Sequence, residues 1–455
     1  MPSLNPSSEA LRVQLMVRGG QSAQELARAL GVSQPTISRQ LSVLGQQVER
    51  IGQGPARRYS LRRSLRAAGH EWPLYRVESS GRVNFFGLLR CLHGGFRVEF
   101  AATLPSWITG DFARSGMFPG LPFFLQDVRP QGFLGRAIAR ACSDTLMLPA
   151  DAQDWSDDDA LVFFLSRGHD LPGDFVVGDS MAQRIGPEAA ANRMISAVDR
   201  AQAYPEFAAQ AERGEVAGSS AGGEQPKFAA SVRNPDGTVG SVLVKFTTAE
   251  PSAIRERWSD LLVCEHLALQ TARTALGVAT STTNLHDFGC RRFLEVTRFD
   301  RVGETGRRGV LSLGAILDAN AFELPNENWA EGALAMARAG VLRDADADAV
   351  RRIAFFGQCI ANNDMHRGNL SFLPDDTGPF TVAPLYDMLP MAYAPTRQGS
   401  IPSEIIRPPV AAPRYRENWD RSFAAARLFW AAVAEHPQVS GGFRRIASTT
   451  LAAMG

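Results

Sequence analysis

The last third of the chain carries two carboxylates and one amide in an order that could support chemistry on a phosphate. Asp364 and Asn369 lie five positions apart in the segment NNDMHRGN, and Asp387 follows in the segment PLYDM. A carboxylate can orient a hydroxyl group and accept its proton, and amide and carboxylate oxygens are ligands that Mg²⁺ accepts. The interval between Asp364 and Asn369 is that between the base and the metal-binding asparagine of an HRDxxxxN loop. Each residue alone is typical of a polar turn.

Lysine occurs at only two positions, Lys227 and Lys245, among 48 basic residues. In a chain that uses arginine elsewhere, the two lysines either mark positions where a compact ammonium is needed and a guanidinium does not fit, or persist by chance, and their neighbourhoods decide between these alternatives. Lys245 lies in the segment SVLVKF, which predicts a strand, and the apolar spacing over 253–276 predicts a helix that carries Glu265. A strand lysine paired with a helix glutamate directs an ammonium toward nucleotide phosphates. Glu256 is an alternative partner.

A loop of small residues, SSAGGEQPK, ends at Lys227. Glycines let a backbone approach a phosphate closely, and consecutive N–H groups can form an anion-binding nest. The loop is neither a Walker A motif nor GxGxxG, and alone it is equally typical of a turn. The ordered set of loop, strand lysine, helix glutamate, Asp364 with Asn369, and the late Asp387 favours phosphoryl transfer from a nucleotide over a series of unrelated turns.

The first 66 residues predict a winged helix-turn-helix. A helix is expected over 9–17, and Ser22 with Glu25 forms a capping box at the start of a second helix over 22–30. Ser33 can cap a third helix, whose apolar face is Ile37, Leu41 and Leu44. The polar face of this third helix is expected to comprise Gln34, Thr36, Ser38, Arg39 and Gln40.

These polar side chains suit base edges and phosphates, and Arg57 and Arg58 on the predicted wing could contact the DNA backbone. Residues 1–66 contain ten arginines against three glutamates, a local excess of +7, although the whole chain carries only +1. This basic segment favours DNA binding over the alternative of a docking or dimerisation domain.

Composition excludes several classes of protein. The 455 residues are 45% hydrophobic and 21% charged, which is typical of a folded protein with two to four domains. No apolar run of membrane-spanning length and no signal peptide is evident, so we expect a cytoplasmic protein without membrane contact. The five scattered cysteines contain no CxxC pair, which favours reduced thiols.

The segments SSAGGEQPK, VLVKF, VTRFDR, NNDMHRGN and PLYDM together resemble the HipA-type serine/threonine kinases, the toxins of bacterial toxin–antitoxin modules. GLPFFLQDVRP upstream is similar to a further feature of this family. A helix-turn-helix fused to such a kinase resembles the YjjJ-like branch, whereas the ordinary toxin takes its DNA-binding domain from a separate antitoxin chain. One departure is Gly368, which stands where the family usually has a lysine before the loop asparagine.

The resemblance implies a role for each matching position. Asp364 would be the catalytic base, Asn369 and Asp387 would bind Mg²⁺, and Lys245 would contact the ATP phosphates. His366 matches a histidine of the catalytic loop, and Ser220 matches a serine that such kinases autophosphorylate. The remaining nucleotide-binding residues implied are the phosphate loop with Gly222, Gly223, Glu224, Gln225 and Lys227, the hinge Thr297 to Phe299, and Asp300 toward the ribose.

The sequence thus predicts an α+β protein: a winged helix-turn-helix over 1–66, a sheet-rich kinase N-lobe with a family-specific subdomain over 67–300, and a helical C-lobe over 301–455. The predicted function is ATP- and Mg²⁺-dependent phosphorylation of a protein Ser/Thr, with a translation-related target, growth inhibition and self-inactivation by autophosphorylation. DNA is the second expected partner, and a homodimer is left open. The alternatives are a one-component transcription regulator that senses nucleotide without turnover, and a small-molecule phosphotransferase of the aminoglycoside-kinase type.

Overall fold

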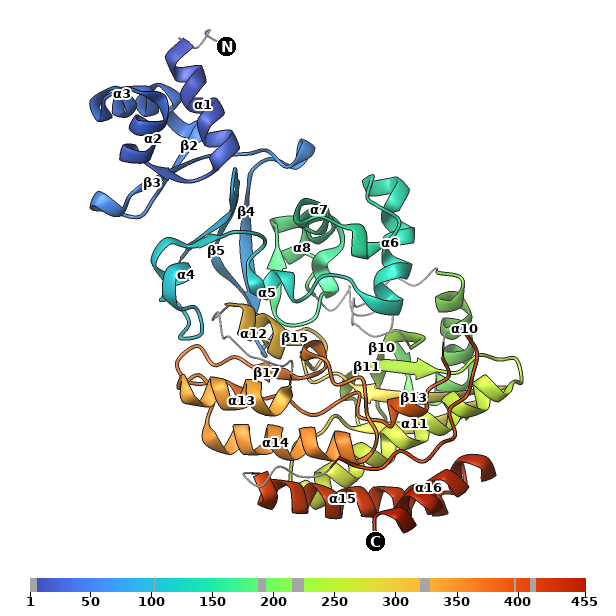
Figure 1. Cartoon of the computed structure of the whole chain (residues 1–455). Helices are drawn as coiled ribbons and strands as arrows, with labels where there is room; N and C mark the ends of the chain where they lie inside the picture. The colour runs from blue at the N-terminus through green and yellow to red at the C-terminus, as the bar shows by residue number, and fades with distance from the viewer. Residues whose placement is uncertain are drawn as a thin grey trace.

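The structure is a computed structural model, and it describes residues 6–101, 103–186, 194–214, 225–319, 328–396, 398–409 and 415–455. A small N-terminal domain stands apart at one end, a middle domain follows, and the remainder forms a sheet lobe and a helical lobe (Figure 1). Among the described residues, no helix has the length and apolar character needed to cross a membrane.

The N-terminal domain has the winged helix-turn-helix arrangement that the sequence predicts. Ser22 and Glu25 form the expected capping box, and Ser33 caps the third helix by accepting from the Thr36 N–H. The apolar faces of the three helices meet in one core that includes Leu11, Leu26 and Ile37. Its elements are α1 (Pro6–Arg18), β1 (Gln21–Ser22), α2 (Ala23–Leu30), α3 (Gln34–Leu44), β2 (Val48–Ile51) and β3 (Arg58–Leu61).

The middle domain is an antiparallel sheet in the order β7-β6-β5-β4-β8, with helices packed beside it. Its long β4–β5 hairpin runs from the N-terminal domain toward the helical lobe (Figure 1). The strands are β4 (Glu71–Val77), β5 (Val83–Leu92), β6 (Gly95–Phe100), β7 (Met117–Phe118) and β8 (Phe175–Val177). The helices are α4 (Gly110–Ser115), α5 (Phe123–Gln126), α6 (Gly132–Leu146), α7 (Asp157–Arg167) and α8 (Asp179–Ala182).

The sheet lobe contains a five-stranded sheet in the order β12-β13-β11-β10-β9. The predicted strand and helix around Lys245 and Glu265 are present as β11 and α11, and α11 packs against β12 and β13. The elements are β9 (Met194–Ser196), α10 (Arg200–Glu212), β10 (Lys227–Arg233), β11 (Val239–Phe246), α11 (Ala253–Thr271), β12 (Thr283–Phe288) and β13 (Arg291–Thr297).

The helical lobe is built on α13 to α16, which lie side by side at the bottom of the molecule (Figure 1). Two short sheets connect it to the rest of the chain. The strands are β14 (Arg301–Val302), β15 (Gly306–Arg307), β16 (Leu311–Ser312), β17 (Ser371–Leu373) and β18 (Thr381–Val382). The helices are α12 (Leu313–Ala319), α13 (Trp329–Arg338), α14 (Asp344–Cys359), α15 (Arg416–Glu435) and α16 (Gly441–Ala453).

Candidate active site

Lys245 lies at the centre of a buried ionic cluster between the two lobes. Its Nζ is 2.7 and 2.6 Å from the two carboxylate oxygens of Glu265 and 2.5 Å from Oδ1 of Asp387. Lys245 is 6% exposed and Glu265 is fully buried, so the ion pair is protected from water. The strand lysine and helix glutamate that the sequence pairs are therefore in contact, whereas Glu256 is exposed in the first turn of α11.

The second lysine lies directly beside the first. Lys227 of β10 is the antiparallel partner of Lys245 of β11, and it is 4% exposed. Burial alone would raise the pKa of Asp387, but the two lysines outweigh burial and hold that pKa below its ordinary value. For Lys245 burial acts in the opposite direction, and the carboxylates of Asp387 and Glu265 outweigh it and raise the lysine pKa. Lys245 therefore stays protonated and Asp387 stays ionised at neutral pH.

Asp364 and Asn369 are joined by a hydrogen bond across their loop. Asn369 Nδ2 donates to the Asp364 carbonyl oxygen at 2.9 Å, and the Asp364 N–H donates to Asn362 Oδ1 at 3.1 Å. The five-residue spacing is thus the length of one closed turn between helix α14 and strand β17. This bond uses the amide nitrogen of Asn369, and the side-chain oxygen is the group that the prediction assigns to a metal ion.

His366 stabilises the turn in the middle of this loop. Its Nδ1 accepts from the Gly368 N–H at 3.0 Å, and its carbonyl oxygen accepts from the Asn369 N–H at 3.0 Å and from Trp329 Nε1 at 2.9 Å. A lysine at position 368 would bring a Cβ to 3.0 Å from the His366 ring, so glycine fits the close approach of that ring.

Asp364 has the electrostatic environment of a carboxylate that accepts protons readily. Burial raises its pKa, and the nearby charge of Asp387 adds to that effect, while His366 and Lys245 act in the opposite direction. Asp387 itself is held at φ 55°, a left-handed conformation that is uncommon outside glycine but tolerated by aspartate. This backbone turn directs the carboxylate toward Lys245.

Tyr386 is a site residue that the spacing argument did not single out. Its hydroxyl donates to the Gly368 carbonyl oxygen at 3.1 Å and lies 2.8 Å from Ser371 Oγ, and its ring is 5.7 Å from the Phe299 ring. Tyr386 thereby connects the loop of Asp364 with the predicted hinge. The sequence feature that could have identified Tyr386 as a site residue is its position immediately before Asp387.

The predicted phosphate loop is described only at its end. Ser220, Gly222, Gly223 and Glu224 lie outside the described residues. Gln225 is described, and its Nε2 is buried without a hydrogen-bond partner in the described part of the chain. A buried amide donor beside Lys227 fits a ligand that carries acceptor oxygens.

The predicted hinge residues lie at the end of β13. The Thr297 N–H donates to the Thr282 carbonyl oxygen at 2.8 Å. The Asp300 carboxylate is buried and accepts from Arg298 at 3.0 and 2.8 Å, from Arg301 at 2.6 Å, and from the Gly173 N–H at 3.1 Å. These bonds fix Asp300 against the middle domain, so a ribose contact would require some of them to open.

The predicted metal ligands are one amide, Asn369, and one carboxylate, Asp387. No group of three or more His, Cys, Asp or Glu side chains that could hold a metal ion occurs within the described ranges. The amide oxygen of Asn369 and the carboxylate of Asp387 nevertheless fit Mg²⁺, which is commonly held by one or two protein oxygens together with substrate phosphates.

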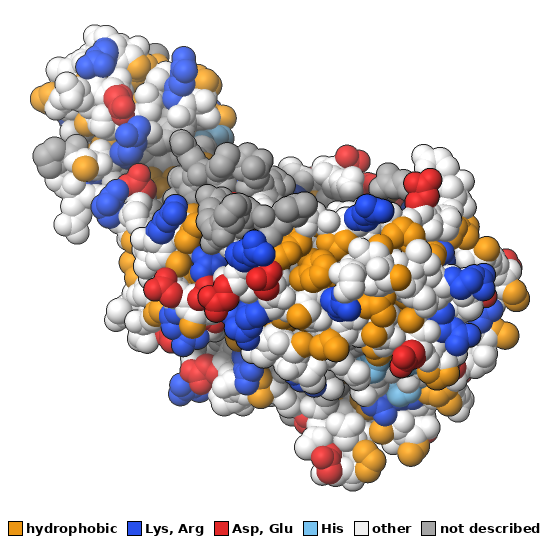
Figure 2. Space-filling view, turned by 60° about the horizontal axis from the view of Figure 1, so that its bottom comes forward, with side chains coloured by type: hydrophobic (Ala, Val, Ile, Leu, Met, Phe, Trp, Pro, Cys, Tyr) orange, Lys and Arg blue, Asp and Glu red, His pale blue; other side chains and the backbone are white. Residues whose placement is uncertain are grey.

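The predicted DNA-contacting residues lie on the outside of the N-terminal domain. Gln34, Ser38 and Arg39 on α3 are exposed, and Thr36 is half-buried. Gln40 is a correction, because it is 6% exposed and belongs to the core face three residues after Ile37. Blue basic side chains outnumber red acidic ones on the visible face of this domain, at the upper left of Figure 2.

The two wing arginines differ from each other. Arg58 is exposed but donates to the Gly20 carbonyl oxygen at 3.1 and 2.9 Å and lies 3.4 Å from Glu25, so it also fastens the wing to α2. Arg57 is exposed, and no side-chain bond joins it to another described residue. Arg57 is therefore the arginine of the pair that is available to a phosphate.

Comparison with known proteins gives three family matches in chain order. Residues 13–47 match the bacterial regulatory proteins of the arsR family, residues 68–186 match the middle domain of YjjJ-like toxins, and residues 219–453 match the HipA-like C-terminal domain. The chain is 35% identical to Toxin YjjJ of Escherichia coli strain K12 over 435 residues, which is 95% of this chain and 94% of that protein.

Two solved structures are similar in shape. One is the Shewanella oneidensis complex of HipA, HipB and operator DNA, with a TM-score of 0.50 and 14% identity over 84% of this chain and 95% of that chain. The other is the Helicobacter pylori proinflammatory kinase CtkA, with a TM-score of 0.34 and 14% identity over 51% of this chain and 89% of that chain. The first supports a two-lobed kinase-like fold behind the helix-turn-helix. With the HipA-like match extending over more than half of its length, the chain belongs to the HipA-like toxin family, in the YjjJ-like branch.

Proposed function

We propose that this protein is an ATP- and Mg²⁺-dependent serine/threonine protein kinase with a DNA-binding domain in the same chain. The observation that carries the proposal is Lys245, which is held by Glu265 and Asp387 next to the loop that joins Asp364 to Asn369. A buried ammonium, a carboxylate base and two metal-binding oxygens are the parts that phosphoryl transfer requires.

Each residue has a distinct task in this proposal. Asp364 accepts the proton of the attacking hydroxyl, and burial suits it to that role by raising its pKa. Asn369 and Asp387 would hold Mg²⁺, which would supply positive charge to the phosphate oxygens. Lys245 places a compact positive charge near the same phosphates, and Glu265 fixes the position of the ammonium through their ion pair.

The N-terminal domain is proposed to bind duplex DNA through α3 and the wing. Gln34 and Arg39 would contact base edges, and Arg57 would contact a phosphate. The similar Shewanella complex contains HipA together with HipB and operator DNA. A DNA-binding domain within the same chain would tether the kinase to DNA. The proposed phosphorylation target is a translation-related protein.

Autophosphorylation is proposed to limit the activity. Ser220 lies outside the described residues, so this proposal rests on the sequence resemblance. A phosphate on this serine would add about −1.5 to −2 charge in the phosphate loop and repel incoming ATP. Growth inhibition by the unmodified protein and its loss after modification would follow from this step.

The test is incubation of the purified full chain with Mg²⁺ and γ-labelled ATP, followed by mass spectrometry of the protein and of an added cell extract. Label on serine or threonine, including Ser220, supports the proposal. Tight ATP binding without turnover would replace it by a nucleotide-sensing transcription regulator, and label confined to small molecules would replace it by a small-molecule phosphotransferase.

A further inference from the structure

A second site is present at the junction of the middle domain and the helical lobe, away from the Lys245 cluster. A cavity of about 510 Å³ is lined by β4, β5, the loop after β15 and the loop after β17. Its volume falls in the range that accommodates small ligands. None of the residues assigned above to nucleotide, metal or DNA lines it.

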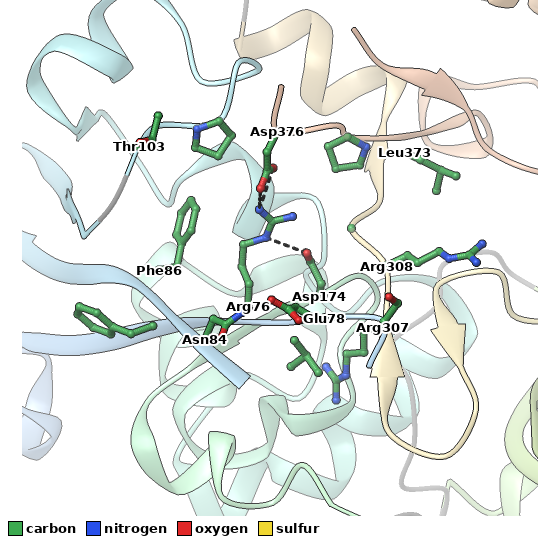
Figure 3. A pocket seen from close by; sticks show the side chains of 16 residues that line it. Arg76, Glu78, Asn84, Phe86, Thr103, Asp174, Arg307, Arg308, Leu373 and Asp376 are labelled. Atoms are coloured by element: carbon green, nitrogen blue, oxygen red, sulfur yellow. Dashed lines mark hydrogen bonds and ion pairs between the residues drawn. The ribbon is translucent and has the colours of Figure 1, made fainter. Parts of the chain in front are cut away.

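Arg76 is the central side chain of this cavity. Its Nε donates to Asp174 Oδ2 at 2.8 Å, and its Nη1 donates to both oxygens of Asp376 at 2.8 and 2.6 Å (Figure 3). Two carboxylates face one guanidinium, so the formal charge of this triad is −1 with both acids ionised, although burial raises the pKa of Asp174.

One carboxylate oxygen of the triad stands out by its burial. Asp174 is 4% exposed, and its Oδ1 is buried without a hydrogen-bond partner in the described part of the chain. The backbone of Gly309 lies close to this carboxylate, because a Cβ there would lie 3.3 Å from both of its oxygens and 2.8 Å from Pro374 Cγ. A buried carboxylate oxygen without a hydrogen-bond donor lowers the stability of the folded protein. A ligand that donates a hydrogen bond to this oxygen would recover that free energy.

The aromatic side chains that line the rest of the cavity suit the alkyl part of a ligand. Phe85 and Phe86 line the cavity, Phe85 is 50% exposed, and the Arg76 guanidinium lies 5.7 Å from the centre of the Phe86 ring. Aromatic rings beside an acidic group are a favourable environment for a cation on an alkyl chain.

The other basic residues of the lining do not neutralise the triad. Arg307 donates to the His169 carbonyl oxygen, and its electrostatic partners are Asp170 and Asp300, which lie outside the lining. In Figure 3 the Arg307 and Arg308 side chains point away from Arg76. Glu78, a third carboxylate of the lining, is paired with Arg82.

From these observations we infer that the cavity binds an ammonium or guanidinium group carried on an alkyl stem, with Asp174 Oδ1 as its acceptor and Phe85 and Phe86 along the stem. Such a group belongs either to a free small amine or to a lysine or arginine side chain of another protein. The site is independent of phosphoryl transfer, so it can be tested without ATP.

The probes are n-butylguanidinium and n-butylammonium, titrated by calorimetry into the full-length protein, with 1-butanol as the uncharged control. We expect saturable binding of at least one cation and none of the alcohol. Asp174→Asn should weaken that binding by about tenfold or more, since a hydrogen bond to a charged group is lost. Asp236→Asn, the same change in an exposed turn, should leave it unchanged.

Phe85→Ala is the second variant, because its exposed position makes it safe for folding if Asp174→Asn is not. The Phe85→Ala change should also weaken binding of the cation. Absence of binding by both cations, or unchanged affinity in whichever of the two variants folds, would overturn the inference. Comparison of n-butylguanidinium with the capped peptide Gly-Arg-Gly separates the sources: equal or tighter binding of the peptide indicates a protein side chain, and binding of the free cation alone indicates a small amine.

Discussion

Lys245 is the residue on which the candidate active site depends most. Three carboxylate oxygens lie within 2.7 Å of its Nζ, and strand β10 places Lys227 beside it. Because Lys245 is 6% exposed, a larger guanidinium at this position would have to displace neighbouring groups. This explains why lysine is retained here in a chain that otherwise uses arginine.

Lys245→Arg should therefore impair the protein although it conserves charge. The guanidinium overfills a position that is 6% exposed, and we expect about 1–3 kcal/mol lower stability together with a large loss of ATP turnover. Chemical denaturation and a phosphorylation assay measure the two effects. Wild-type turnover in this variant would show that the compact ammonium is not required.

Asp364→Asn should remove phosphoryl transfer and keep the fold. The amide cannot accept the proton, so we expect about 10²–10⁴-fold lower turnover. ATP affinity should change little, because Lys245 and the metal ligands remain. The matched control is Asp344→Asn, an exposed aspartate in the first turn of α14, which should behave as wild type. Equal losses in both variants would contradict the assignment of the base.

At the scale of elements, helix α10 packs on the sheet through apolar side chains and is also bonded to it through the carboxylate of Glu295. Glu295 of β13 accepts from Arg200 at 2.7 and 3.2 Å and from Tyr204 at 2.5 Å, and His286 lies 3.7 Å away. Burial by itself would raise the Glu295 pKa, but His286, Arg200 and Tyr204 outweigh it and lower the pKa to about 2.

This depressed pKa predicts a pH-dependent stability. The unfolded chain binds the Glu295 proton near pH 4.3, whereas the folded protein binds it only near pH 2. The contribution of Glu295 is therefore complete above about pH 4.3 and is lost as the pH falls toward 2. Urea unfolding between pH 5 and pH 3 should show a shallower decline for Glu295→Gln than for wild type. Glu206→Gln, an exposed change on α10, should retain the wild-type slope.

The recognition helix and the wing should contribute differently to DNA binding. Arg57→Ala is expected to lower affinity about equally for all sequences and to reduce the salt slope by about 1, because it removes one phosphate contact. Gln34→Ala and Arg39→Ala should change sequence preference instead. Binding of the full chain to a randomised duplex library at several salt concentrations distinguishes these outcomes. If DNA binding is absent or independent of salt, the N-terminal domain would instead be a docking domain.

The spacing of apolar residues predicted the helices and strands near the site. The order of a strand lysine followed by a helix glutamate predicted that Lys245 contacts Glu265. Gln40 was misplaced because its polarity was given more weight than its spacing from Ile37, which puts it on the core face. The bonds of Asp300 and the Arg76–Asp376 pair could not be predicted. Arg76 and Asp376 are 300 positions apart, and no local periodicity carries information over such a separation.

At the scale of the whole molecule, the N-terminal domain is fastened to the middle domain by a buried carboxylate. Glu49 of β2 is 4% exposed and accepts from Arg62, and Arg90 and Arg97 of the middle sheet reach the same side chain. One glutamate thus joins the wing to β5 and β6. A rigid connection of this kind would fix the orientation of the DNA reader relative to the kinase-like lobes.

Glu49→Gln should weaken this connection. Removing the carboxylate that these three arginines share is expected to cost about 3 kcal/mol, as for a broken buried ion pair. Limited proteolysis should then cleave faster in the segment 62–70 between the two domains. Glu99→Gln, whose side chain is 55% exposed and pairs with Arg90 alone, should cost much less. Equal protease resistance in all three proteins would show that other contacts hold the domains together.

The pairing of Lys227 with Lys245 has a consequence for the chemistry of the whole surface. These are the only lysines of the chain, and both are less than a tenth exposed. The exterior of the folded protein therefore offers no lysine amine to acetylation, ubiquitin-type tagging or chemical acylation. Acylation of lysine in the native state would therefore report the opening of the contact between Lys245 and Asp387 or exposure of Lys227.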